Sequence, residues 1–357
     1  MRKKEKEQWH SLFTRSGFPV YILDLAGRAY VRDMKKRLGW GYTSQRFIVQ
    51  QGMTTSYYSE TDRKSFRRFI QRVAPASILA RNRKIIKEIC QDQQKILDLV
   101  AHSGPNIEDL LIWLKKMTVG YSRIYAVYRF PSMVDVLAAD LVTEKVLLDC
   151  ARAKDEIGSL LSELDRKILS RFFHFLSLVT PWAEKDLRFL TGREIESLLK
   201  GRLTVTHREL SERTRHCVLV INSQGEVDIR LGIAAKQLTP RANQVRSEIV
   251  RGKTVCPGCV RGQAVVTFAA KDLAVETGQV IVISPMITVD YGPWLKKVIG
   301  LVTDEGGLTS HAAIVAREKN IPCLVGTKNG SRVFHSGDWV ELDAGAGVCR
   351  QIKKNNY

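Results

Sequence analysis

A histidine at the start of a predicted helix is the strongest candidate for chemistry in this sequence. His311 follows Gly306 and Gly307, and it comes directly after Thr309 and Ser310, whose side chains favour the N-cap position of a helix. A helix N-terminus has unpaired N–H groups and a partial positive charge, so it binds phosphate well. The same polarity favours the neutral, nucleophilic form of an imidazole. The pattern predicts that His311 is a nucleophile whose phosphorylated form is stabilised by backbone amides.

Charged residues on both sides of His311 have less certain roles. Asp304 and Glu305 adjoin the glycines, and they could orient His311 or a partner's Mg²⁺, or remain solvated loop charges. Arg317 and Glu318 lie about two helical turns further on, where surface or packing roles are favoured over catalysis.

The segment Cys256-Pro-Gly-Cys259 has the spacing of a zinc or redox pair. No second pair of this kind and no close pair of histidines completes a set of four ligands, so we expect a turn and no metal. Seven cysteines in 357 residues form a sparse, odd-numbered set. This usage fits a reducing, cytoplasmic compartment.

The elements that must position His311 belong to a distinct C-terminal part of the chain. From Thr254 onward, strands alternate with glycine-rich turns around one amphipathic helix that lies between Gly307 and Asn320. The predicted strands cover 263–268, 280–284, 298–303 and 339–342. We therefore expect an α/β domain over residues 253–357.

Residues 1–215 are predicted to be mainly helical, with a connector from about residue 185. Apolar residues recur at helical spacing over 63–73, 78–100, 106–117, 134–150, 156–179 and 191–199. The segment from Pro19 to Leu23 is a candidate strand. Residues 216–252 are predicted to form a β-hairpin, with Gly225 in its turn, and then a hinge.

The net charge of +19 is concentrated in the front of the chain. Such a field attracts nucleic acid, anionic membrane, acidic proteins or phosphorylated metabolites, and it does not distinguish among them. Basic clusters lie at 35–37 and 63–68, near the aromatic residues Trp40, Tyr42, Tyr57 and Tyr58, which could stack on bases. Since no nucleic-acid module surrounds them, a solvated helix face or a docking face for an acidic partner is favoured. No apolar run is long enough to span a membrane, and no signal peptide is evident.

The segment from Thr303 to Gly326 resembles the phosphohistidine motif of the phosphoenolpyruvate-utilising enzymes. This family includes phosphoenolpyruvate synthase, pyruvate phosphate dikinase, enzyme I of the sugar phosphotransferase system and rifampin phosphotransferase. The segment from Val282 to Trp294 resembles a further part of the same domain, and the resemblance covers about residues 250–352. It implies a multidomain α+β protein in which a mainly helical N-terminal region precedes a swivelling β/β/α phosphohistidine domain.

The resemblance implies that His311 carries a phosphoryl group between two sites, supported by Thr309, Ser310, Gly306 and Gly307. Thr309 matches a regulatory phosphorylation site of some dikinases. The implied activity is that of a phosphotransferase, a kinase-type transferase. It implies Mg²⁺ with ATP or phosphoenolpyruvate, held mostly by a partner.

No ATP-grasp domain or phosphoenolpyruvate-binding barrel is recognisable in the sequence. The resemblance therefore implies that the chain works with a separate ATP-grasp-type nucleotide-binding protein, a phosphoenolpyruvate-binding domain, or both. Two alternatives remain open: a non-catalytic regulatory or assembly module that retains the fold, and a basic nucleic-acid-binding protein.

Overall fold

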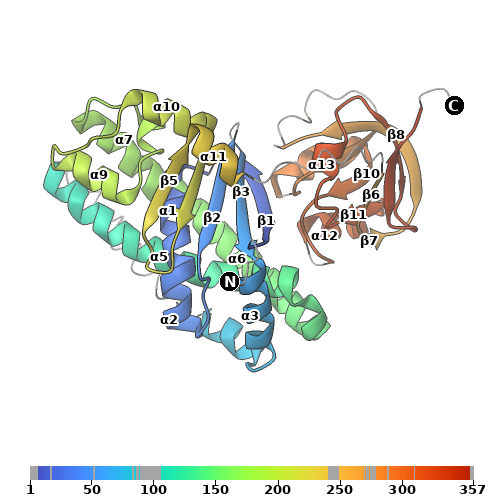
Figure 1. The fold of residues 1–357 in the computed structure, drawn as a ribbon. Helices are drawn as coiled ribbons and strands as arrows, with labels where there is room; N and C mark the ends of the chain where they lie inside the picture. Colours follow the sequence, from blue (N-terminus) through green and yellow to red (C-terminus); the bar gives the residue numbers. More distant parts are fainter. Residues whose placement is uncertain are drawn as a thin grey trace, which may run out of the picture. The chain divides into compact units, whose positions relative to one another are not determined.

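The computed structural model describes residues 7–353 apart from 17, 51–52, 83, 86–87, 89–105, 240–248, 269, 271–272, 274–278, 288 and 309. The chain divides into two compact units (Figure 1). Residues 1–12 and 17–239 form the first unit, and residues 13–16 and 240–357 form the second. The protein is therefore a multidomain α+β protein.

The first unit is built around a five-stranded sheet with the order β1-β3-β2-β4-β5, of which the end of β1, residues 13–16, is assigned to the second unit. Strand β2 pairs antiparallel with both β3 and β4, and β4 pairs antiparallel with β5. The strands are β1 (Trp9–Ser16), β2 (Gln45–Gln50), β3 (Met53–Ser59), β4 (His216–Ile221) and β5 (Val227–Leu231).

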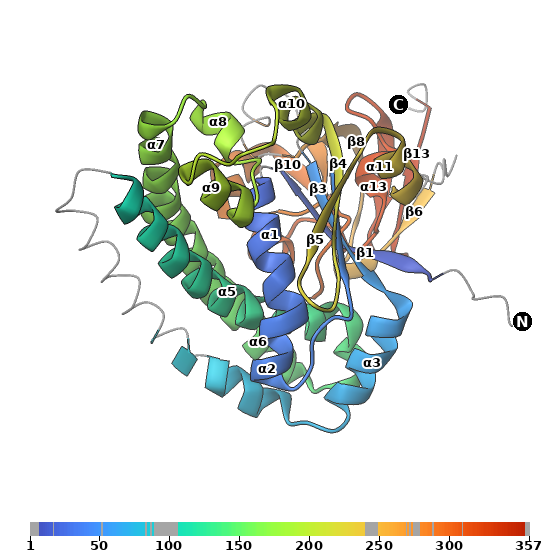
Figure 2. The ribbon, with the colours of Figure 1, turned by 60° about the vertical axis from the view of Figure 1, so that its left-hand side comes forward.

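Helices make up most of the rest of the first unit (Figure 2). The longest of those within the described residues, α5 (Ile107–Leu137), has Asn106 as its N-cap, whose side chain accepts a hydrogen bond from the backbone N–H of Asp109 at 2.8 Å. The others are α1 (Val20–Arg28), η1 (Ala29–Asp33), α2 (Met34–Leu38), α3 (Glu60–Ile70), η2 (Ala139–Leu141), α6 (Glu144–Leu164), η3 (Asp165–Leu169), α7 (Ser170–Val179), α8 (Glu184–Leu187), α9 (Gly192–Leu199), α10 (His207–Arg215) and α11 (Gly232–Leu238), and residues 75–82 are also helical.

Two local expectations about the front of the chain are wrong. The candidate strand at Pro19 is the start of helix α1, which is buried along its length, and a helix buried on all sides lacks the polar face that distinguishes it from a buried strand. The expected helix over 134–150 is interrupted, because α5 ends at Leu137 and α6 starts at Glu144. The prediction for 78–100 falls mostly outside the described residues.

The hairpin around Gly225 is confirmed, but it is not part of a separate hinge region. Its first strand, β4, pairs with β2 from Gln45↔Ile221 to Gln50↔His216, so the hairpin completes the sheet of the first unit. The following segment is helix α11, whose Ala235 is fully buried near Val218. The division between the units comes at 239/240, inside the segment 216–252 that was predicted as hairpin and hinge. The rest of the predicted hinge, 240–248, lies outside the described residues.

The second unit contains an eight-stranded sheet with the order β6-β13-β12-β8-β9-β10-β11-β7. Strands β8, β9, β10 and β11 are parallel neighbours, and the remaining pairs that are resolved are antiparallel. Its elements are β6 (Ile249–Arg251), β7 (Lys253–Cys256), β8 (Cys259–Val266), β9 (Val280–Ser284), η5 (Val289–Lys297), β10 (Val298–Thr303), α12 (His311–Lys319), β11 (Cys323–Val325), α13 (Gly330–Val333), β12 (Trp339–Asp343) and β13 (Val348–Gln351).

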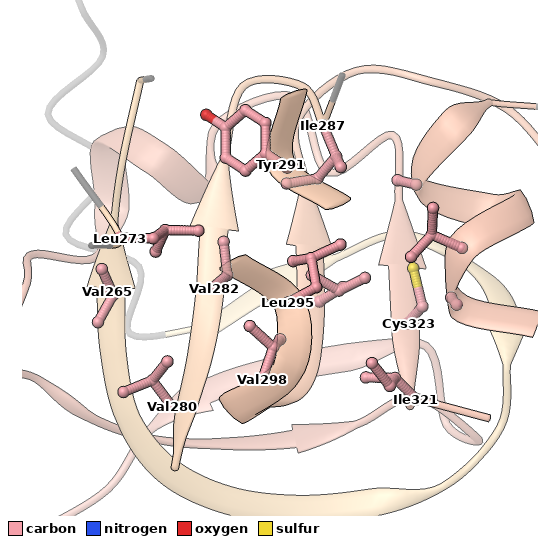
Figure 3. Close-up of a cluster of buried hydrophobic side chains, with 14 of the residues drawn as sticks. Val265, Leu273, Val280, Val282, Ile287, Tyr291, Leu295, Val298, Ile321 and Cys323 are labelled. Atoms are coloured by element: carbon pink, nitrogen blue, oxygen red, sulfur yellow. The ribbon is translucent and has the colours of Figure 1, made fainter. Parts of the chain in front are cut away.

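Alternating side chains of the central strands build two separate cores in the second unit. Val280 and Val282 of β9 enter a cluster with residues of η5 and α12, which Figure 3 shows in part. Ile281 and Ile283 point to the opposite face and enter a cluster that contains Phe334 and residues of β12. Because both faces of β9 are buried, its sequence is a continuous apolar run, and such runs predicted β9 and β10 at their observed bounds.

Among the helices that the structure describes, none has both the length and the hydropathy needed to cross a lipid bilayer.

Candidate functional site

The predicted helix start at His311 is confirmed. Ser310 is the N-cap of α12, and its Oγ accepts a hydrogen bond from the backbone N–H of Ala313 at 3.3 Å. Its carbonyl oxygen accepts from the N–H of Ile314 at 3.0 Å. His311 is the first residue of the helix and is partly exposed. Thr309, the expected supporting and regulatory residue, lies outside the described residues.

Two backbone N–H groups at this helix terminus lack an acceptor among the described residues. Within the part of the chain that the structure describes, the N–H groups of His311 and Ala312 have no acceptor. The helix geometry explains this, because the first N–H groups of an α-helix have no carbonyl one turn earlier. Donors of this kind, at the positive end of the helix dipole, attract an anion.

The two glycines bring the chain into this helix through a tight turn. Gly306 has φ +105°, and a Cβ at this position would lie 2.8 Å from the Cβ of Ser310, the helix cap. Only glycine meets both requirements without strain. Gly307 is buried, and its carbonyl accepts from the N–H of Ser310 at 3.0 Å. Both glycines therefore shape the loop that presents His311.

Arg317 forms a hydrogen bond to the loop before α12, which its position in the sequence did not indicate. Its Nη1 donates a hydrogen bond to the carbonyl oxygen of Leu308 at 2.8 Å, so it ties the loop to the second turn of α12. The side chains of Leu308 and Ile314 are exposed at 47% and 37%. The imidazole of His311 thus lies in a segment with two exposed apolar side chains. Glu318 is exposed.

Asp304 is buried, and it is fully engaged away from the histidine. Its Oδ1 accepts from Thr327 Oγ1 at 2.9 Å and from the N–H of Ser331 at 3.1 Å. Its Oδ2 accepts from the Oγ and the N–H of the same serine. The suggestion that Asp304 orients His311 directly or binds Mg²⁺ does not fit this arrangement, since both carboxylate oxygens already have donors.

The described residues offer no set of ligands for a metal ion. They contain no group of three or more His, Cys, Asp or Glu side chains with the geometry to hold one. The Mg²⁺ ion that the resemblance implies therefore has no ligand set among the described residues of this chain.

The two cysteines of the CxxC segment lie in different environments. Cys256 is buried and its Sγ donates to Oδ1 of Asn320 at 3.7 Å, at the C-terminal end of α12, whereas Cys259 is exposed. Cys323 faces Cys256 across the β7–β11 pair, and burial raises the pKa of its thiol to about 12. A thiol of this kind is poorly reactive, because the thiolate is the nucleophilic form.

The aromatic residues proposed to stack on bases are not available for stacking. Trp40, Tyr42, Tyr57 and Tyr58 are all at least nine-tenths buried. The indole Nε1 of Trp40 donates to Ser65 Oγ at 3.0 Å, and its ring packs against Phe66. These side chains belong to the core of the first unit, so this part of the nucleic-acid interpretation is wrong.

Comparison with known proteins points to the same segment. The protein family described as "PEP-utilising enzyme, mobile domain" matches residues 276–347, which include His311. The chain is 31% identical over 169 residues to a probable phosphoenolpyruvate synthase of Methanothermobacter thermautotrophicus, covering 46% of this chain and 24% of that protein. It is 40% identical over 180 residues to another from Archaeoglobus fulgidus, covering 47% of this chain and 23% of that protein.

The similarity also extends to an enzyme with a different name. A pyruvate kinase of Staphylococcus haemolyticus is 34% identical over 104 residues, covering 29% of this chain and 18% of that protein. The chain thus matches less than a quarter of the length of each of these curated relatives.

Proposed function

We propose that the second unit, whose residues 276–347 match the mobile domain of phosphoenolpyruvate-utilising enzymes, is a swivelling domain that carries a phosphoryl group on Nε2 of His311. The observation that carries the proposal is the position of His311. A partly exposed imidazole begins α12, next to two backbone N–H groups without acceptors among the described residues. This is the arrangement expected of a nucleophile whose phosphorylated form is stabilised by the helix terminus.

The proposed step is a displacement at phosphorus. The lone pair of the imidazole nitrogen forms a P–N bond, the P–O bond to the donor breaks, and the leaving oxygen keeps the electron pair. Transfer to the second site reverses these changes, with an acceptor oxygen attacking phosphorus and the neutral imidazole leaving. The backbone N–H groups of His311 and Ala312 donate to the phosphoryl oxygens while the group is carried.

The donor and acceptor sites of the proposal lie on other domains or polypeptides. One is an ATP-grasp-type nucleotide-binding site, and the other is a phosphoenolpyruvate/pyruvate-type site or one for another acceptor. A carrier domain attached to its partner visits both sites at high effective concentration. The exposed side chains of Leu308 and Ile314 are available for contact with either site.

The test is phosphorylation of the full chain in host-cell extract, with labelled phosphoenolpyruvate and, separately, with ATP labelled at the β or γ position. We expect a label that is stable in base and labile in acid, and that is lost in His311→Ala. The matched control is His335→Ala, which removes an exposed histidine of the same unit and should keep the label. The donor that works would identify the partner chemistry.

Two results would contradict the proposal. A label that persists in His311→Ala would assign the phosphoryl group to a different residue. If a phosphoenolpyruvate synthase added to the same extract became labelled and this chain did not, the chain would be a non-catalytic regulatory or assembly module.

A further inference from the structure

Asp304 occupies the base of the loop that presents His311. It directly follows β10, is 8% exposed, and is separated by one residue from the turn at Gly306. Its carboxylate is engaged with the segment that follows β11, through Thr327 and Ser331. These donors come 23 and 27 residues later in the chain. The side chain therefore links the His311 loop to a second loop of the same unit.

Backbone hydrogen bonds strengthen the same link. The N–H of Thr327 donates to the carbonyl of Thr303 at 3.0 Å, and the N–H of Lys328 donates to the carbonyl of Asp304 at 2.9 Å. On the other side, the N–H of Asp304 donates to the carbonyl of Ser284 at 3.1 Å. The base of the loop is thus held between the segments that follow β9 and β11.

The chemistry of the link favours a carboxylate. The hydroxyl of Thr327 lies 2.9 Å from Asp304 Oδ1 and 3.1 Å from the carbonyl oxygen of Thr303, and a hydroxyl can donate or accept. The N–H of Ser331 can only donate, and it lies 3.1 Å and 3.3 Å from the two Asp304 oxygens, so an ionised carboxylate offers it two acceptors. An asparagine would place its NH₂ group beside the Ser331 N–H in either orientation, so this N–H would keep one acceptor instead of two. Hydrogen bonds to a charged acceptor are also stronger than those between neutral groups.

We propose that Asp304 is the positioning residue for His311: its buried carboxylate fixes the loop so that the imidazole and the N–H groups of α12 hold one phosphoryl group together. The inference rests on the proposed function and adds a residue that acts without touching the phosphoryl group. Because the link also passes through Thr327, removal of the Thr327 hydroxyl should have the same effect as neutralisation of Asp304.

The test uses a donor that needs no partner. Phosphoramidate phosphorylates histidine directly: the P–N bond to ammonia breaks, a new P–N bond to the imidazole forms, and ammonia leaves. The full chain is labelled in this way, with the His311→Ala signal subtracted, and the hydrolysis rate of the phosphohistidine is measured. We expect Asp304→Asn and Thr327→Val to hydrolyse about tenfold faster than the wild type, because the loop no longer holds the N–H donors against the phosphoryl oxygens.

Two variants separate positioning from general destabilisation. Thr327→Ser keeps the hydroxyl that bonds Asp304 and should restore the wild-type lifetime. Asp343→Asn is the control, because it neutralises a carboxylate that also accepts a backbone hydrogen bond in a turn. Oδ1 of Asp343 accepts from the N–H of Ala346 at 2.9 Å, in the connection between β12 and β13. This control should have the wild-type lifetime. Equal lifetimes in the wild type, Asp304→Asn and Thr327→Val would overturn the inference.

A second readout decides the inference even if the proposed function fails. If the wild-type chain takes up no phosphoryl group at His311 from phosphoramidate, the proposed function is contradicted, and Asp304 is then judged by amide hydrogen exchange. Faster exchange at Ser310 and Ala313 in Asp304→Asn and Thr327→Val, with wild-type exchange in Thr327→Ser, would support the positioning role. Unchanged exchange at both amides would overturn it.

Discussion

At the scale of single residues, the site depends on a backbone conformation that only glycine adopts easily. Gly306 combines a positive φ with a close approach to Ser310. We expect Gly306→Ala to destabilise the second unit by about 1–3 kcal/mol and to displace the His311 loop. Gly292→Ala is the control, since a Cβ there has open space. Urea unfolding of the two variants measures the difference, and equal stabilities would contradict the strain assigned to Gly306.

A second prediction at this scale concerns Asp165 in the first unit. Burial raises the pKa of its carboxyl to about 6, and Tyr121 donates to it at 3.0 Å. Because this pKa lies above that of the unfolded chain, the folded state holds the proton more tightly. The group's contribution to stability is present below about pH 4 and is lost as the pH rises through 6, by up to about 3 kcal/mol. Asp165→Asn should remove this pH dependence, which denaturant unfolding at pH 4.5 and pH 7 measures. If the free energy of unfolding changed between the two pH values as much in the variant as in the wild type, the prediction would be contradicted.

At the scale of elements, the first turn of helix α12 has two roles: Ser310 caps the helix, and the same terminus is proposed to bind the phosphoryl group. Ser310→Ala should cost about 1 kcal/mol, because the N–H of Ala313 loses its acceptor. Ser310→Asp keeps an acceptor, so stability should be retained, but it places a negative charge where the phosphoryl group is proposed to bind. We therefore expect Ser310→Asp to fold normally and to accept phosphoryl groups more slowly. Thermal unfolding and phosphoramidate labelling measure the two effects, and equal labelling of Ser310→Asp and the wild type would argue against phosphate binding at this terminus.

At the scale of the whole molecule, the chain consists of two units, each with a sheet and core of its own. Because each unit has its own core, we expect substitutions to act locally. Asp165→Asn should change hydrogen exchange in the first unit and leave α12 unaffected, whereas Gly306→Ala should have the opposite pattern. If either variant changed amide hydrogen exchange in both units, the two units would unfold together and the prediction would be contradicted.

The sequence by itself determined those features whose causes lie within a few residues of each other. Strands β9 and β10 follow from a local run of apolar residues, and the start of α12 follows from Ser310 and the two glycines. The resemblance to phosphoenolpyruvate-utilising enzymes was carried by one continuous segment around His311, and the match of their mobile domain to residues 276–347 confirms this resemblance.

Only the tertiary structure decided the features that join distant parts of the chain. The front region is an α+β unit because β2 pairs with β4, although about 170 residues separate them in sequence. Asp304 is an acceptor for Thr327 and Ser331, and the carboxylate alone could not indicate that its donors follow β11. Local propensity and periodicity act over single elements, whereas strand pairing and buried hydrogen bonds are selected by the packing of the whole unit.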